Sequence, residues 1–102
     1  MRILLIEDEG LAAERVQDIL ASIDSTISVV GHLKSVEGSV QWLQSNPAPD
    51  LILSDIRLLD GLCFEIFEIV SVDAPVIFTT AFDQYAIKAF EVNSIDYLLK
   101  PS

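Results

Sequence analysis

The sequence predicts a doubly wound α/β domain built on a five-stranded parallel sheet. Five short runs that are apolar throughout alternate with four segments of helical spacing. Strands without a polar face are buried on both sides, as in the middle of such a sheet. Strand–helix alternation joins parallel strands through right-handed crossovers. The 102 residues are enough for one domain with one modest core.

The first half of the chain supplies two strands and two helices. Residues 3–6 are a continuous β-type run, and 27–33 are a second stretch rich in β-branched side chains. Residues 11–23 carry apolar side chains at helical spacing. Residues 36–44 do the same, and the Asn46-Pro47 pair predicts the end of that helix.

The second half supplies three strands and two helices. Residues 51–53, 76–79 and 95–99 are the apolar runs of the strands, and 62–70 has helical spacing. A last helix is expected over 83–91, with Asp83 as its N-cap. No helix follows the fifth strand, so we expect either a domain truncated before its final helix or a sheet covered by another copy.

The composition excludes several classes of function. The chain has 6 Lys and Arg and 16 Asp and Glu, which gives a formal net charge of −10. Binding to nucleic acid or to an anionic membrane needs clustered basic residues, so neither is expected of this chain itself. The single cysteine, Cys63, cannot form an internal disulfide. No apolar run approaches the ~20 residues of a membrane span, and a cytoplasmic domain is expected.

Polar side chains follow four of the five predicted strands. Glu7 and Asp8 come after the first strand, Asp55 after the third, Thr80 at the end of the fourth and Lys100 after the fifth. Ligands of open parallel sheets bind at the carboxyl ends of the strands, where these side chains would meet. The second strand, which ends near His32, contributes nothing obvious.

The chemistry of this set points to magnesium and phosphate. Converging carboxylates repel one another, and Mg²⁺, which prefers oxygen ligands and often shares a phosphate oxygen, removes that conflict. Lys100 could pair with a phosphoryl group and Thr80 could donate a hydrogen bond to it. An Asp carboxylate can attack phosphorus and form an acyl phosphate. The plainer interpretation is that these are solvated loop positions, with Thr80 only ending its strand and Lys100 pairing with Asp55.

Four short motifs in this order carry a resemblance to a known family. They are LIEDE at Leu5–Glu9, LSDI at Leu53–Ile56, TTA at Thr79–Ala81 and YLLKP at Tyr97–Pro101. With them, the whole chain resembles the receiver domain of two-component response regulators. The stretch 78–101 further resembles receivers that precede a LytTR-type DNA-binding domain. The resemblance implies a flavodoxin-like sheet in the order 2-1-3-4-5.

The resemblance also implies roles for individual residues. Asp55 would accept a phosphoryl group from a histidine kinase. Asp8 would bind Mg²⁺ directly, Glu7 through water, and the backbone carbonyl of Arg57 would be a further ligand. Glu7 stands where Asp is commoner in the family.

Three residues near the end of the chain would complete the site and its switch. Thr80 would hydrogen-bond the phosphoryl group and Lys100 would pair with it, and a cis Lys100–Pro101 bond would aim the Lys100 amine at the site. Tyr97 would turn inward as Thr80 moves, which changes the face formed by 83–99. A partner or a second copy would read that face, and a C-terminal domain outside this chain would contact DNA.

Alternatives from other classes stay open. An aspartyl phosphohydrolase usually carries its nucleophile after the first strand in a D-x-D pattern, where this chain has Glu7-Asp8-Glu9. A flavin-binding flavodoxin-like domain needs a phosphate-binding Ser/Thr/Gly-rich loop at the same place. A receiver-like interaction module that is never phosphorylated is the third alternative. Cys63 and Trp42 are interpreted as packing residues, and His32 as a residue without a site role.

Overall fold

The computed structural model describes residues 1–80 and 94–99, with only the backbone described for Thr80 and for 94–99. The predicted helix over 83–91, Lys100 and the Lys100–Pro101 bond lie outside the described residues. No helix within the described part of the chain has the length and apolar character needed to cross a membrane.

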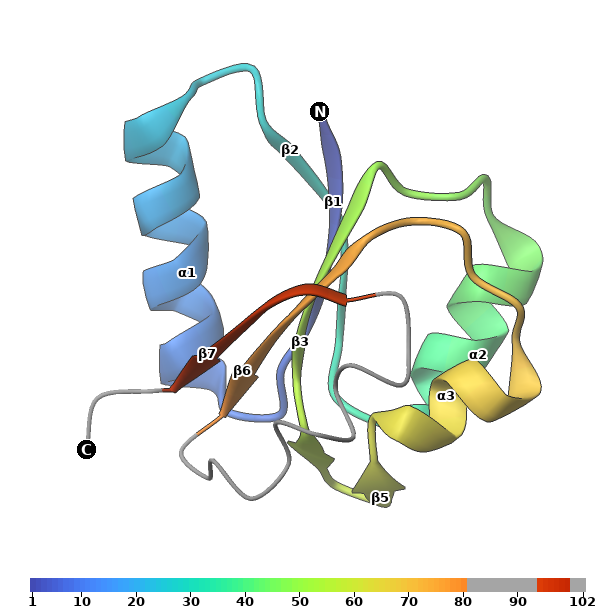
Figure 1. Cartoon of the computed structure of the whole chain (residues 1–102). Helices are drawn as coiled ribbons and strands as arrows, with labels where there is room; N and C mark the ends of the chain where they lie inside the picture. The colour runs from blue at the N-terminus through green and yellow to red at the C-terminus, as the bar shows by residue number, and fades with distance from the viewer. Residues whose placement is uncertain (81–93, 100–102) are drawn as a thin grey trace.

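A five-stranded parallel sheet forms the centre of the molecule (Figure 1). Its strands lie in the order β2-β1-β3-β6-β7, and each neighbouring pair is parallel. The strands are β1 (Arg2–Ile6), β2 (Ser28–Leu33), β3 (Leu51–Asp55), β6 (Val76–Thr80) and β7 (Ser94–Leu99). The predicted order 2-1-3-4-5 is therefore confirmed.

Helices cover both faces of this sheet, as expected of a doubly wound domain. Helix α1 (Gly10–Ile23) lies on one face, and α2 (Val36–Ser45) and α3 (Phe64–Ile69) lie on the other (Figure 1). The Ser35 hydroxyl accepts a hydrogen bond from the backbone N–H of Gly38 and so caps α2.

The core lies mainly between the sheet and α2 and α3. Leu4, Ile6, Ile52 and Phe78 are completely buried there. Because side chains alternate across a strand, Ile3 and Leu5 of β1 point to the opposite face, which α1 covers. The continuous apolar runs are thus buried on both faces, as predicted.

The apolar spacing of α1 correctly predicts a helix, but not the burial of its side chains. Ala13 is its buried residue. Leu11, Ile19 and Ile23 are exposed by 70%, 57% and 69% of their surface.

The prediction of a helix over 62–70 is wrong at its start. Leu62 belongs to a two-stranded antiparallel ribbon, in which β4 (Arg57–Leu58) pairs with β5 (Gly61–Leu62), and α3 begins at Phe64. The Glu65 carboxylate accepts a hydrogen bond from the backbone N–H of Leu62 at 2.8 Å, which holds the ribbon against the first turn of α3. Gly61 has a positive φ of 153°, a conformation that favours glycine at this turn.

Candidate functional site

Three carboxylates converge at the carboxyl edge of the sheet. Glu7, Asp8 and Asp55 each offer an oxygen, and these three oxygens lie within 4.8 Å of one another. The sheet register explains the convergence: Ile6, the last residue of β1, is paired with Ser54 of β3. The residues that follow each of these two positions therefore meet at one place.

Glu7 is held in a buried position by its backbone and by its side chain. The residue is only 2% exposed, and Oε1 accepts a hydrogen bond from the backbone N–H of Glu9 at 3.2 Å. Its own N–H donates to the carbonyl of Leu33 at 2.8 Å, which ties the end of β1 to the end of β2. The side chain is thereby directed into the cluster rather than into solvent.

Asp55 is the last residue of β3, two residues beyond the predicted end of that strand. It is 9% exposed. Its Oδ1 accepts a hydrogen bond from the backbone N–H of Ile56 at 2.7 Å, and its carbonyl accepts one from the Ser54 hydroxyl at 2.8 Å. These contacts fix the orientation of the carboxylate at the end of a central strand.

The second strand, expected to contribute nothing obvious to the site, contacts the backbone of one site residue through His32. Its Nε2 lies 2.9 Å from the carbonyl oxygen of Glu7. A carbonyl can only accept, so Nε2 is the donor in this hydrogen bond. No local pattern in the sequence signals this contact, since the two residues are 25 positions apart.

Cys63 belongs to the hydrophobic core, as predicted. Its side chain is fully buried, and burial raises the pKa of the thiol to about 12, with a smaller contribution from the charge of Asp55. Its backbone N–H donates to the carbonyl of Ile56 at 2.7 Å, which closes the base of the β4–β5 ribbon.

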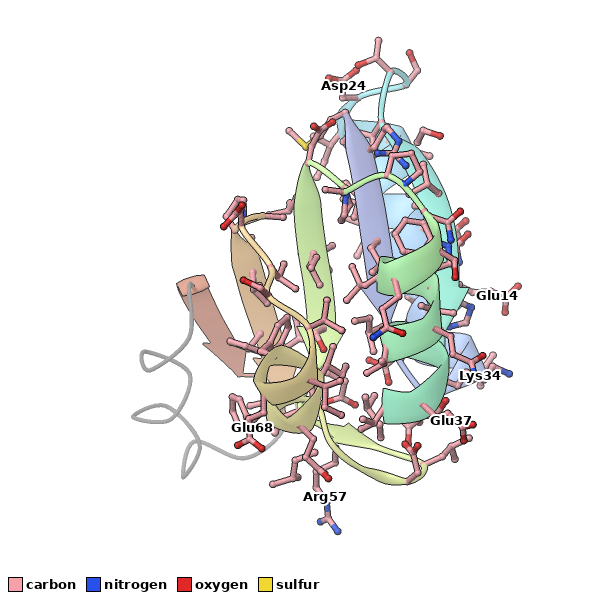
Figure 2. The ribbon with its side chains drawn as sticks, turned by 90° about the vertical axis from the view of Figure 1, so that its right-hand side faces the viewer. Glu14, Asp24, Lys34, Glu37, Arg57 and Glu68 are labelled. Carbon is pink, nitrogen blue, oxygen red and sulfur yellow. The ribbon has the colours of Figure 1, made fainter. Side chains whose placement is uncertain are left out.

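Arg57 is the first residue of that ribbon, two positions after Asp55. Its guanidinium points away from the ribbon (Figure 2). The side chain is exposed, so the predicted role of this residue depends on its backbone carbonyl alone.

The other predicted site residues are described only in part or not at all. Thr80 follows Thr79, the register partner of Asp55, and Tyr97 is the register partner of Phe78. Their backbones thus lie on the strands next to β3 and β6. Lys100 lies outside the described residues.

Comparisons with known proteins agree with the fold. Residues 3–102 match the response regulator receiver domain. In the response regulatory domain of protein mrkE from Klebsiella pneumoniae, 84% of that chain superposes on 100% of this one, with a TM-score of 0.82 and 31% identity. The chain therefore belongs to the response regulator receiver domain family.

The curated relatives place the chain more narrowly. It is 36% identical to the sensory transduction protein LytT of Bacillus anthracis, over 99% of this chain and 42% of that protein. It is 40% identical to the transcriptional regulatory protein BtsR of Salmonella typhi, again over 99% of this chain and 42% of the relative. This receiver domain is thus related to LytTR-type regulators, and the chain spans about two-fifths of the length of the curated relatives that it matches.

Proposed function

We propose that Asp55 accepts a phosphoryl group from the phosphohistidine of a sensor histidine kinase. The observation that carries this proposal is the convergence of Glu7, Asp8 and Asp55 within 4.8 Å, at the carboxyl edge of a receiver sheet. Asp55 is the member that ends the central strand β3, between β1 and β6.

The donor set of the site fits Mg²⁺. Three carboxylates supply hard oxygen ligands, the kind that Mg²⁺ prefers. Glu7, Asp8, Asp55 and the backbone carbonyl of Arg57 would hold the ion. When bound, Mg²⁺ supplies positive charge that offsets the charge of the carboxylates and of the transferred group.

The transfer itself is a displacement at phosphorus. An oxygen of the Asp55 carboxylate forms a bond to phosphorus as the phosphorus–nitrogen bond of the phosphohistidine breaks. The electron pair of that bond returns to the imidazole, which is protonated on its other nitrogen and leaves as a neutral ring. The hydrogen bond from the Ile56 N–H to Oδ1 holds the attacking carboxylate in one orientation throughout.

Three further residues are assigned to the phosphorylated state. Thr80 hydrogen-bonds the phosphoryl group, Lys100 pairs with its charge, and Tyr97 turns inward as Thr80 moves. This biases a two-state equilibrium of the face over 83–99, which a partner or a second copy reads. The kinship with transcriptional regulators supports an output through a C-terminal LytTR-type DNA-binding domain.

The test compares the parent with Asp55→Asn after incubation with acetyl phosphate and Mg²⁺. The parent gains one phosphoryl group by intact mass, the variant gains none, and chelation of Mg²⁺ abolishes the gain. Equal gains by both proteins would exclude Asp55 as the acceptor. A parent that gains no phosphate and binds no beryllofluoride would instead be a receiver-like interaction module.

A further inference from the structure

The loop after the phosphoacceptor is fastened to a helix that takes no part in the carboxylate cluster. The β4–β5 ribbon leaves β3 directly after Ile56, and its tip, Leu59–Asp60, reaches the start of α2. The Asp60 carboxylate accepts hydrogen bonds from the backbone N–H groups of Val36, at 2.6 Å, and Glu37, at 3.1 Å. Leu59 N–H donates to the carbonyl of Lys34 at 3.3 Å.

Asp60 completes the hydrogen bonding of this helix end. The first four N–H groups of a helix have no partner within it. In α2, Asp60 accepts from the first two, at Val36 and Glu37, while the Ser35 hydroxyl and carbonyl accept from Gly38 and Ser39. Two residues therefore share the capping of α2: Ser35, directly before the helix, and Asp60, 24 positions after Val36.

The ribbon is consequently held at both ends. At its base, Cys63 N–H donates to the Ile56 carbonyl at 2.7 Å, next to Asp55. At its tip, Asp60 binds α2 through both carboxylate oxygens. Arg57, which carries the proposed ligand carbonyl, lies between these two attachments and pairs with Leu62.

We infer that Asp60 is a positioning residue for the metal-binding loop: its two hydrogen bonds to α2 hold the ribbon that carries Arg57, whose backbone carbonyl is the further proposed ligand. This inference rests on the proposed function, since it concerns the same Mg²⁺ site. Residues that orient metal ligands from outside the coordination sphere commonly change affinity by ~10–100-fold when they are replaced.

The experiment measures Mg²⁺ binding by calorimetric titration and the Mg²⁺ dependence of phosphorylation by acetyl phosphate. Asp60→Ala is expected to weaken Mg²⁺ binding about tenfold. Asp60→Asn, which keeps one accepting oxygen, is expected to fall between Asp60→Ala and the parent. At saturating Mg²⁺ the phosphorylation rate of both variants returns close to that of the parent, because the acceptor itself is untouched.

Two matched controls separate positioning from simpler effects. Ser35→Ala removes the other cap of the same helix end without touching the ribbon. Glu37→Gln removes one negative charge, as Asp60→Ala does, but from the first turn of α2, and it leaves the backbone N–H that binds Asp60 in place. Both are expected to bind Mg²⁺ within about twofold of the parent, a shift below ~0.4 kcal/mol.

The outcomes distinguish this inference from the proposed function. If Asp60→Ala and Ser35→Ala shift Mg²⁺ binding equally while the parent is phosphorylated, Asp60 is only a helix cap and the inference is overturned alone. If the parent neither binds Mg²⁺ nor takes up phosphate, the proposed function fails and the inference fails with it. Circular dichroism of each variant checks that the fold is retained.

Discussion

The rings of Phe64 in α3 and Phe78 in β6 lie with their centroids 5.3 Å apart and their planes tilted by 56°. Phe67 approaches Phe78 edge-on from the next turn of α3, with centroids 6.0 Å apart. This group of three rings attaches the short helix α3 to β6, the strand that ends at Thr80.

Removal of the Phe78 ring, which contacts both of the others, is expected to destabilise the fold. Phe78 is fully buried, so Phe78→Ala is predicted to lower the free energy of unfolding by about 3–5 kcal/mol, through lost burial and the cavity that remains. Urea denaturation measures the change. Ile69→Ala, at a position of α3 that is 62% exposed, is the control and should change stability by less than about 1 kcal/mol.

A second prediction concerns the close packing of β2 under α2. A Cβ atom at Gly31 would lie 2.8 Å from Nε1 of Trp42 and 3.0 Å from Cδ1 of Leu4. Gly31→Ala is therefore expected to push the indole outward and to destabilise the fold by about 1–3 kcal/mol. Trp42 is the only tryptophan, so a red shift of the native fluorescence reports the displacement. An unchanged spectrum and stability would show that the neighbours absorb the methyl group.

The Cys63 thiol is predicted to be inert in the folded protein. It is fully buried and its pKa is raised to about 12, so the reactive thiolate is scarce at neutral pH. A thiol reagent should label it only after denaturation, or at a rate set by unfolding. Rapid labelling of the native chain, with the fold intact by circular dichroism, would contradict this.

The Asp60 cap predicts a specific dependence of stability on pH. Hydrogen bonds from the backbone N–H groups of Val36 and, second, Glu37 hold the pKa of Asp60 below its ordinary value of 3.8. A carboxylate with a lowered pKa stabilises the fold above its unfolded pKa, and this contribution disappears as the pH falls through the folded pKa.

Thermal unfolding of the parent and of Asp60→Asn tests this dependence. The advantage of the parent over Asp60→Asn should be largest near neutral pH and should shrink as the pH falls below about 4. The difference between the two proteins is the relevant quantity, because the other carboxylates titrate in both. A difference that stays constant down to about pH 3 would remove the ionised cap from the explanation.

The carboxylate cluster predicts a stability gain when one of its charges is removed. Without Mg²⁺, Glu7, Asp8 and Asp55 lie close enough to repel one another. Asp8→Asn should therefore raise the free energy of unfolding by about 1 kcal/mol and the Tm by roughly 4–8 °C. Added Mg²⁺ should raise the Tm of the parent but not that of the variant. A variant that melts below the metal-free parent would contradict the repulsion.

The sequence predicted those parts of the molecule that local patterns determine. Continuous apolar runs marked the strands, and the position of Asp55 after one of them placed it at the edge where Glu7 and Asp8 lie. The ribbon over 57–62 was missed because Leu62 continues the helical spacing of the segment that follows. Leu62 belongs to a strand instead because it pairs with Arg57. Its backbone N–H also donates a hydrogen bond to the Glu65 carboxylate.

Contacts between distant segments could not be predicted in the same way. His32 meets the Glu7 carbonyl, and Asp60 meets the start of α2, only because the sheet and its crossovers bring these segments together. Aspartate followed by glycine predicts a turn at 60–61, but a turn does not reveal which helix lies beside it.

Because Asp55 is the final residue of the middle strand, the sheet fixes its position while the neighbouring loops determine the surroundings of its carboxylate. Neighbouring strands on both sides hold Asp55 in place, whereas Glu7, Asp8 and the 56–62 segment lie outside the five-stranded sheet, in connections that can change in length or composition without disturbing it. Exchange of the 56–62 segment for that of a relative is therefore a direct way to change the lifetime of the proposed phosphorylated state while the sheet stays the same.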